Sequence, residues 1–337
     1  MNKTVLITGG TGFIGRALAR KMLSSGYKVR VLTRKDPSSL NLPDIEFVQG
    51  SYDDVDSLAK AMGGCHAVFH LAALISGCET QDFVKANAVA TANMVSGCIK
   101  ASPQPEAFIY VSSIAAGGPS QDKNSPRVES MGAAPVSDYG RTKLAGEKEL
   151  LRLPPGIKTV VLRPPMVYGR SDLGLSKTAR WVNRGFMVNM CQGETYFSFI
   201  YVEDFINVLY TALVSPATAG RTYYVCEDKQ YQWTYFIGEM AKAMGKKMPT
   251  MITLPPAQLM LLGKVYARLA KLLHAEPAFH PDKAREAAAG NWIASPKLWM
   301  QDTGWKCWTP LTEGMAKSFS ASAERQPGCQ ESSCAEG

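Results

Sequence analysis

The stretch that decides the fold is Thr8–Gly15, which reads Thr-Gly-Gly-Thr-Gly-Phe-Ile-Gly. It follows a short apolar run, Thr4–Thr8, and leads into a helical pattern over 14–25. In such a turn Gly9 permits a tight reversal, Gly12 lets backbone amides approach a pyrophosphate, and Gly15 allows close packing of helix on strand. The helix N-terminus then faces the anion. The segment therefore predicts a dinucleotide-binding strand, turn and helix.

The rest of the first half alternates in the same way. Short apolar runs interleave with helical patterns, which is typical of βαβ units and a parallel sheet. We therefore expect an α/β fold, a doubly wound parallel sheet of the Rossmann type. The expected strands are 4–8, 28–33, 45–49, 67–71, 107–111 and 159–163, and the expected helices are 14–25, 55–62, 82–100 and 139–151.

Composition narrows the class of protein. Apolar residues make up 46% and charged residues 20% of the 337 residues, as in folded, soluble proteins. Lys and Arg exceed Asp and Glu by 37 − 29 = 8, an excess too diffuse to indicate nucleic-acid binding. The eight Cys and four His show no spacing for a metal site. With no export signal and no long apolar run, we expect a cytoplasmic location and no transmembrane segment.

The end of the second strand predicts which dinucleotide is bound. An acid there would accept hydrogen bonds from the ribose of NAD, whereas this chain has Thr33 followed by Arg34. A guanidinium pairs well with a 2′-phosphate, so NADP is favoured. NAD stays the alternative, with Asp36 turned back toward the ribose.

Tyr139 and Lys143 stand four residues apart at the start of a helix, on one face. An ammonium near a phenol favours the ionised form, so we expect Lys143 to lower the pKa of Tyr139 for proton transfer. Ser112 and Ser113 end a strand at the carboxyl edge of the sheet, where one of them can donate to a substrate oxygen.

Taken in order, these pieces resemble the extended short-chain dehydrogenases/reductases, the NAD-dependent epimerase/dehydratase family. The matching segments are 8–15, His70-Leu-Ala-Ala73, Tyr110-Val-Ser-Ser113, Tyr139-Gly-Arg-Thr-Lys143, Arg163-Pro-Pro-Met-Val-Tyr-Gly169 and Tyr201-Val-Glu-Asp204. The resemblance implies that Tyr139 is the general acid/base, that Lys143 binds the nicotinamide ribose, and that Ser113, the second of its pair, orients the substrate oxygen. It implies cofactor contacts from Gly9, Thr11, Gly12, Phe13, Ile14, Gly15, Thr33, Arg34, Ser51, Tyr52, Leu71, Ala72, Ala73, Tyr139, Lys143, Pro164, Met166 and Val167.

Two positions depart from the family pattern. Members that act on nucleotide sugars usually place an arginine where this chain has Phe197, so the phosphate clamp is missing. The acid that touches adenine aligns with Ser51, and either Tyr52 or Asp53 is open as its substitute. The first departure favours an apolar substrate, as in the steroid dehydrogenase and dihydroflavonol reductase branches.

The second half predicts a smaller, mainly helical substrate lobe. We expect the cofactor domain to take 1–165 with about 198–226, the lobe 166–197 with 227–320, and a disordered tail 321–337. Within 256–273 apolar residues recur at helical spacing beside Lys264, Arg268 and Lys271. Both a helix packed on the lobe and a lid touching lipid or a membrane surface stay open.

The leading hypothesis is an oxidoreductase that moves hydride between NADP(H) and a carbonyl or secondary alcohol of a hydrophobic small molecule. The alternatives are a nucleotide-sugar epimerase or dehydratase with tightly held NAD, and a cofactor-sensing protein without turnover. The resemblance also suggests a homodimer.

Overall fold

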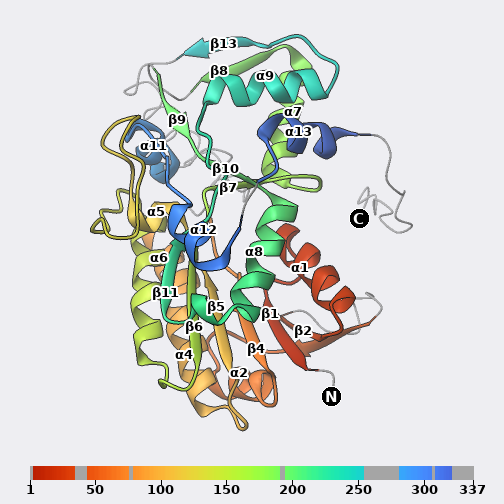
Figure 1. Cartoon of the computed structure of the whole chain (residues 1–337), viewed down its shortest axis with the longest axis vertical. Coiled ribbons are helices and arrows are strands. Elements are labelled where there is room, and N and C mark those ends of the chain that lie inside the picture. Colours follow the sequence, from red (N-terminus) through yellow and green to blue (C-terminus); the bar gives the residue numbers. More distant parts are fainter. Residues whose placement is uncertain are drawn as a thin grey trace, which may run out of the picture.

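In a computed structural model, the chain is described over residues 3–34, 44–75, 79–189, 194–253, 281–305 and 308–320. Seven parallel strands of this part form one sheet in the order β11-β6-β5-β4-β1-β2-β3, and Figure 1 shows it in the lower half of the molecule. The strands are β1 (Thr4–Thr8), β2 (Lys28–Thr33), β3 (Ile45–Gln49), β4 (Ala67–His70), β5 (Ala107–Val111), β6 (Lys158–Arg163) and β11 (Arg221–Tyr224).

This order confirms the expected Rossmann sheet. From β1 the chain first winds outward through β2 and β3, then returns to place β4, β5 and β6 on the other side of β1. The reversal between β1 and β4 is the switch point at which α/β sheets bind ligands beyond the carboxyl ends of their strands. Both the glycine turn after β1 and the loop after β4 lie there.

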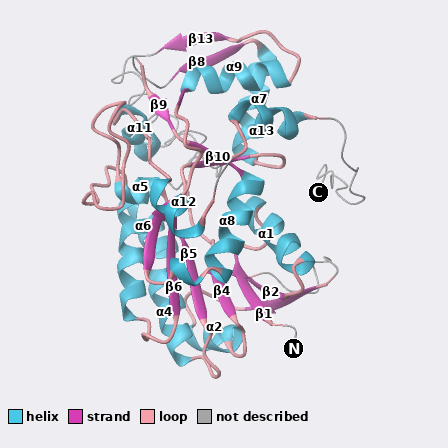
Figure 2. Ribbon diagram, in the orientation of Figure 1, coloured by secondary structure: helices cyan, strands magenta, loops and turns pink. Residues whose placement is uncertain are grey.

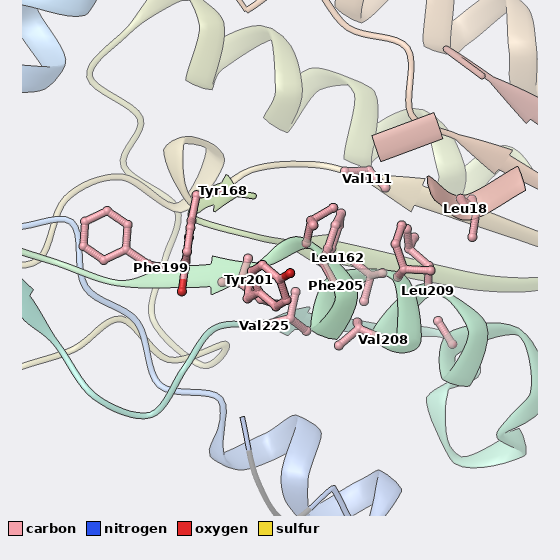
Figure 3. Packing of buried hydrophobic residues seen from close by; sticks show 14 of the residues in the cluster. Leu18, Val111, Leu162, Tyr168, Phe199, Tyr201, Phe205, Val208, Leu209 and Val225 are labelled. Atoms are coloured by element: carbon pink, nitrogen blue, oxygen red, sulfur yellow. The ribbon is translucent and has the colours of Figure 1, made fainter. Parts of the chain in front are cut away.

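Helices cover both faces of the sheet. On one face lie α1 (Phe13–Ser24) and α8 (Val202–Val214), and on the other lie α2 (Val55–Met62), α4 (Ala90–Lys100) and α6 (Asp138–Glu149). Figure 3 shows the first face from close by, with Phe205 and Leu209 of α8 against Leu162 of β6. Short elements complete this part: α3 (Thr80–Phe83), a π-helix (Val84–Val89), α5 (Ile114–Gly117), α12 (Lys297–Thr303) and 3-10 turns at Leu150–Arg152 and Pro216–Thr218.

The upper part of the molecule is a mixed α/β lobe (Figure 2). Three two-stranded sheets pair β10 with β7, β12 with β9 and β13 with β8. Its strands are β7 (Met166–Tyr168), β8 (Phe186–Asn189), β9 (Tyr196–Phe197), β10 (Phe199–Tyr201), β12 (Tyr231–Gln232) and β13 (Thr250–Thr253), and its helices are α7 (Leu173–Arg184), α9 (Trp233–Ala243), α11 (Pro281–Ala288) and α13 (Leu311–Phe319).

For the second half of the chain, one strand was not expected and two predicted segments cannot be compared. β11 was not expected as a strand, yet it pairs with β6 and is covered by α12, where Trp299 stacks edge-on against Tyr223 at 5.2 Å. The helical pattern at 256–273 and the tail 321–337 lie outside the described residues. In the described ranges, no helix is long and apolar enough to cross a bilayer.

Candidate active site

The glycine turn has the backbone geometry that its sequence predicted. Gly9 has φ +68°, and a Cβ there would come within 3.1 Å of the Ala72 amide nitrogen. A Cβ on Gly15 would fall 2.2 Å from the Gly9 carbonyl oxygen. Gly12 is the N-cap residue of α1 and has no side chain to cap it, so the helix N-terminus keeps its amides for an anion. Thr11 and Gly12 are exposed beside it, and Phe13 and Ile14 are half-buried. This cradle fits a dinucleotide pyrophosphate.

A threonine and a histidine hold the loop after β4 beside that cradle. The Thr8 hydroxyl oxygen accepts hydrogen bonds from the Leu71 and Ala72 amides, both at 3.2 Å, and shares one of 2.8 Å with His70 Nδ1. Burial lowers the pKa of His70 to about 3, so this ring is neutral and structural. Leu71 and Ala72 thus lie against the glycine turn, and Ala73 after them is exposed; their contacts with a cofactor stay a prediction.

The ends of β2 and β3 carry the residues expected to meet the adenosine half. Thr33 is buried, whereas Arg34 just beyond it is exposed. Tyr52 is half-buried and hydrogen-bonds Thr8, while the Ser51 hydroxyl oxygen accepts from the Asp53 amide at 3.2 Å. Asp36, on which the NAD alternative depends, lies outside the described residues.

The loop after β6 lies against both other parts of the site. The Pro164 carbonyl accepts from the Ile114 amide at 2.9 Å, which ties this loop to the residue after Ser113. A Cβ on Gly169 would sit 3.4 Å from the Phe13 ring, so the same loop also reaches the start of α1. Met166 is exposed and Val167 half-buried between these anchors, where the resemblance places the nicotinamide.

Ser113 and Tyr139 meet directly. A hydrogen bond joins their side chains, and Tyr139 is 9% exposed while Ser113 is half-buried. The neighbouring Ser112 instead donates to Glu147 Oε1 at 2.5 Å, and Glu147 is held by Arg163 at 2.6 and 2.9 Å. Ser112 is therefore engaged beneath the site, and Ser113 is the serine of the pair that can assist Tyr139.

The pKa of Tyr139 moves opposite to the sequence-based expectation. Burial raises it and the Ser113 hydrogen bond only partly opposes this, with Glu286 adding a further upward effect. The Lys143 ammonium lies 4.2 Å over the Tyr110 ring. Burial lowers the pKa of Lys143 to about 7, against the favourable charge of Glu147. The predicted lowering of the tyrosine pKa is thus wrong for this structure because desolvation dominates.

Two residues that the sequence analysis missed hold the helix that carries Tyr139 and Lys143. The buried Asp282 carboxylate of α11 accepts from the amides of Asp138 at 2.7 Å and Tyr139 at 3.1 Å. The buried Asn87, inside the π-helix, donates to the Thr142 hydroxyl of α6 at 3.2 Å and bonds the Leu74 backbone in both directions. An asparagine inside an apolar helical pattern was the available signal for Asn87. Asp282 is too distant in sequence to leave one.

The comparisons with known proteins decide the family. The model of the NAD dependent epimerase/dehydratase family matches residues 5–226. This chain belongs to that family. Its relatives include a ceramide reductase of Caulobacter vibrioides, 28% identical over 94% of this chain and 90% of that protein. A 2-alkyl-3-oxoalkanoate reductase of Stenotrophomonas maltophilia is 24% identical over 95% and 99%.

Solved structures confirm the fold. The structure of MoeE5 in complex with UDP-glucuronic acid and NAD superposes with a TM-score of 0.73, covering 94% of this chain and 97% of that one at 21% identity. At 21% identity this similarity establishes only the fold of the chain, a Rossmann sheet with flanking helices.

Within this family fold, Tyr139 is surrounded by apolar side chains. Phe83 meets the Tyr139 ring edge-on at 6.5 Å. The Phe197 backbone forms a parallel β-bridge with Trp292, and the Phe197 ring is tilted against Trp233 with the ring centroids 5.9 Å apart. We call this cluster the apolar wall. Its members are Leu74, Phe83, Ile114, Ala115, Val136, Tyr139, Phe197, Tyr224, Cys226, Ala289, Trp292 and Ala294.

A lysine lies over the Tyr139 ring, and the Arg163 guanidinium lies 5.4 Å from the centroid of the Tyr224 ring. Lys283 Nζ lies 5.2 Å from the centroid of the Tyr139 ring and 2.8 Å from the Glu286 carboxylate. Glu286 in turn accepts from the Ser137 hydroxyl at 2.7 Å. Because Glu286 balances the lysine locally, the immediate surroundings of Tyr139 combine an apolar surface with a neutralised ion pair.

Proposed function

We propose that this protein is an NADP(H)-dependent oxidoreductase that acts on a carbonyl or secondary alcohol of a hydrophobic, lipid-like molecule. The observation that carries the proposal is the apolar wall around Tyr139, with Phe197 at the position where the family's nucleotide-sugar enzymes usually have an arginine. A diphosphate brought there would lose hydration without gaining a charge-assisted bond, whereas an alkyl chain would gain from burial.

In this proposal the chain's own residues position the reacting oxygen and move its proton. Tyr139 Oη exchanges the proton with the substrate oxygen, and the Ser113 hydroxyl donates to that oxygen as its charge develops. Lys143 binds the nicotinamide ribose. The dinucleotide, when bound, supplies or accepts the hydride.

The preference for NADP belongs to the proposal and rests on Arg34. This exposed guanidinium follows β2, where an acid would select the free ribose hydroxyls of NAD. A 2′-phosphate would give Arg34 a bidentate anionic partner.

The names of two full-length relatives support a lipid-like substrate. One is described as a ceramide reductase and the other as a 2-alkyl-3-oxoalkanoate reductase. Both are reductases whose named substrates carry alkyl chains, which is the chemistry that the apolar wall would accept.

Thermal unfolding of the NADPH-saturated protein tests the substrate class. We expect a long-chain methyl ketone to raise the melting temperature and UDP-glucose to leave it unchanged. Tyr139→Phe keeps the ring, so it should retain this protection while losing about 10² to 10⁴ in NADPH turnover. Protection by UDP-glucose alone would favour the epimerase alternative, and full turnover by Tyr139→Phe would remove Tyr139 as the acid.

A further inference from the structure

The far end of the lobe carries an exposed apolar surface. β8 and β13 pair in parallel with Val188 opposite Ile252, at the top of Figure 1. Phe186, Val188 and Ile252 are 40%, 40% and 45% exposed, while the alternate residue Met187 is buried. Trp181 of α7, 43% exposed, packs edge-on against Phe186 at 5.3 Å. We call Trp181, Phe186, Val188 and Ile252 the outer patch.

Cations border the outer patch. The Arg184 guanidinium stacks 5.1 Å from the Trp181 ring, and Arg180 lies one helical turn earlier. Lys246 and Lys247 are exposed in the segment before β13. The Thr250 amide at the start of β13 donates to the Gly185 carbonyl at 2.9 Å, so this segment ends beside the C-terminus of α7. Over the described ranges, no carboxylate pairs with any of these four cations.

The two arginines also line a hollow beside the patch. It measures about 510 Å³ and lies between α7 and the last residues of α9 and α13. Ser176 and Asn183 contribute polar side chains to the same hollow. A cavity of this size with two guanidinium groups suits a phosphate-bearing headgroup.

Exposed aromatic and aliphatic side chains bordered by cations that have no carboxylate partner among the described residues match one kind of partner best. At an anionic membrane surface the apolar side chains enter the interface, and each nearby cation gains from the negative surface potential. A second copy of this chain fits less well, because a two-fold contact through the patch would bring its cations against their own copies. Nucleic acid would leave Val188 and Ile252 unused.

We propose that the outer patch docks this protein on anionic phospholipid bilayers, with the hollow at Arg180 and Arg184 receiving lipid phosphates. The inference deepens the proposed function, on which it rests for its purpose, since a lipid-like substrate resides in membranes. The docking face itself follows from the exposed residues of the outer patch and does not depend on the proposed function.

Cosedimentation with vesicles tests the proposal directly. The full chain should bind phosphatidylcholine vesicles containing phosphatidylglycerol and bind pure phosphatidylcholine weakly. Arg180→Gln with Arg184→Gln should weaken binding about 30-fold, as expected for two cations near such a surface. Trp181→Ser with Ile252→Ser should weaken it more than about tenfold.

Matched controls lie on the sheet domain. Lys28→Gln with Lys148→Gln changes two exposed lysines, and Leu151→Ser removes a side chain that is 86% exposed. Both should bind vesicles as the unchanged protein does. Equal binding to neutral and anionic vesicles, or an equal loss from the controls, would overturn the proposal.

Two further measurements distinguish membrane docking from the proposed function and from dimer formation. Without vesicles, the patch variants should reduce a short, water-soluble ketone as fast as the unchanged protein does. If neither the unchanged protein nor the variants reduce it, the proposed function is contradicted and the docking proposal is not. If sedimentation velocity instead shows that Trp181→Ser with Ile252→Ser dissociates a dimer that ignores vesicles, the patch is a contact between copies and the docking proposal is wrong.

Discussion

At the residue scale, Lys143 carries its charge in an unfavourable environment. Its ammonium is buried, which lowers its pKa to about 7 from an ordinary 10.5. Between these values the folded protein binds fewer protons than the unfolded chain, so the free energy of unfolding rises with pH across this window. Below pH 7 Lys143 is charged in both states, and burying that charge lowers the free energy of unfolding by its full amount.

Lys143→Met should therefore stabilise the fold while damaging cofactor binding and turnover. The variant removes a buried charge and keeps an unbranched side chain of similar length. We expect its melting temperature to exceed that of the unchanged protein at pH 6 and the gap to shrink by pH 9. Lys148→Met, an exposed lysine on the same helix, should show no gap. A constant gap at both pH values would contradict the assigned pKa.

Arg34 carries the second prediction at this scale. Arg34→Ala should weaken NADPH binding about 10- to 100-fold in calorimetric titration, because a charge-assisted contact to the 2′-phosphate is lost. NADH affinity should stay the same. Arg20→Ala, which removes an exposed arginine of α1, should alter neither. If the unchanged protein binds both cofactors equally, the NADP preference is wrong.

At the scale of elements, α6 depends on a residue far along the chain. Asp282 of α11 accepts from two amides at the start of α6, and Ser137 accepts from a third, that of Gly140, at 2.9 Å. These bonds satisfy amides that a helix N-terminus otherwise leaves unpaired. α11 thereby positions the helix whose first and second turns carry Tyr139 and Lys143.

Asp282→Ala should lower both stability, by about 1 to 2 kcal/mol, and the turnover number. Asp282→Asn keeps one acceptor oxygen and should recover most of the turnover. The matched control is Asp172→Ala, which removes a side chain that caps α7 through the amides of Gly174 and Leu175. It should lose similar stability with little change in the turnover number at saturating substrate. Equal turnover losses in the two alanine variants would reduce Asp282 to a structural role.

The local patterns of the first half were sufficient to predict its strands, whereas the helix expected at 82–100 consists of α3, a π-helix and α4. β1, β2, β3 and β5 have the expected bounds, since apolar runs ended by turn residues are local signals. β11 was not predicted because Arg221–Tyr224 becomes a strand only through pairing with β6, about 60 residues earlier. Long-range contacts of this kind leave little trace in a local pattern.

The same distinction holds for the site. The glycine turn and the Tyr139, Lys143 spacing are local, and the structure brings Tyr139 and Ser113 together as expected. The sign of the tyrosine pKa shift was missed because it depends on burial by Phe83, Trp292 and other members of the apolar wall, which come from separate parts of the chain. The capping by Asp282 was missed for the same reason.

At the scale of the whole molecule, the two parts combine a cofactor cradle with an apolar surface. The sheet domain brings the glycine turn, the loop after β4 and Tyr139 to one edge. β9 from the lobe and the segment after α11 add Phe197 and Trp292 beside Tyr139. We propose that this combined surface selects a hydrophobic carbonyl compound.

The most direct measurement is kcat/KM for NADPH-dependent reduction of methyl ketones of increasing chain length. Each buried methylene contributes about 0.8 kcal/mol, so kcat/KM should rise about fourfold per carbon until the apolar surface is filled. Tyr139→Phe should be inactive across the series. A flat series, together with conversion of UDP-glucose by the same protein, would contradict the account.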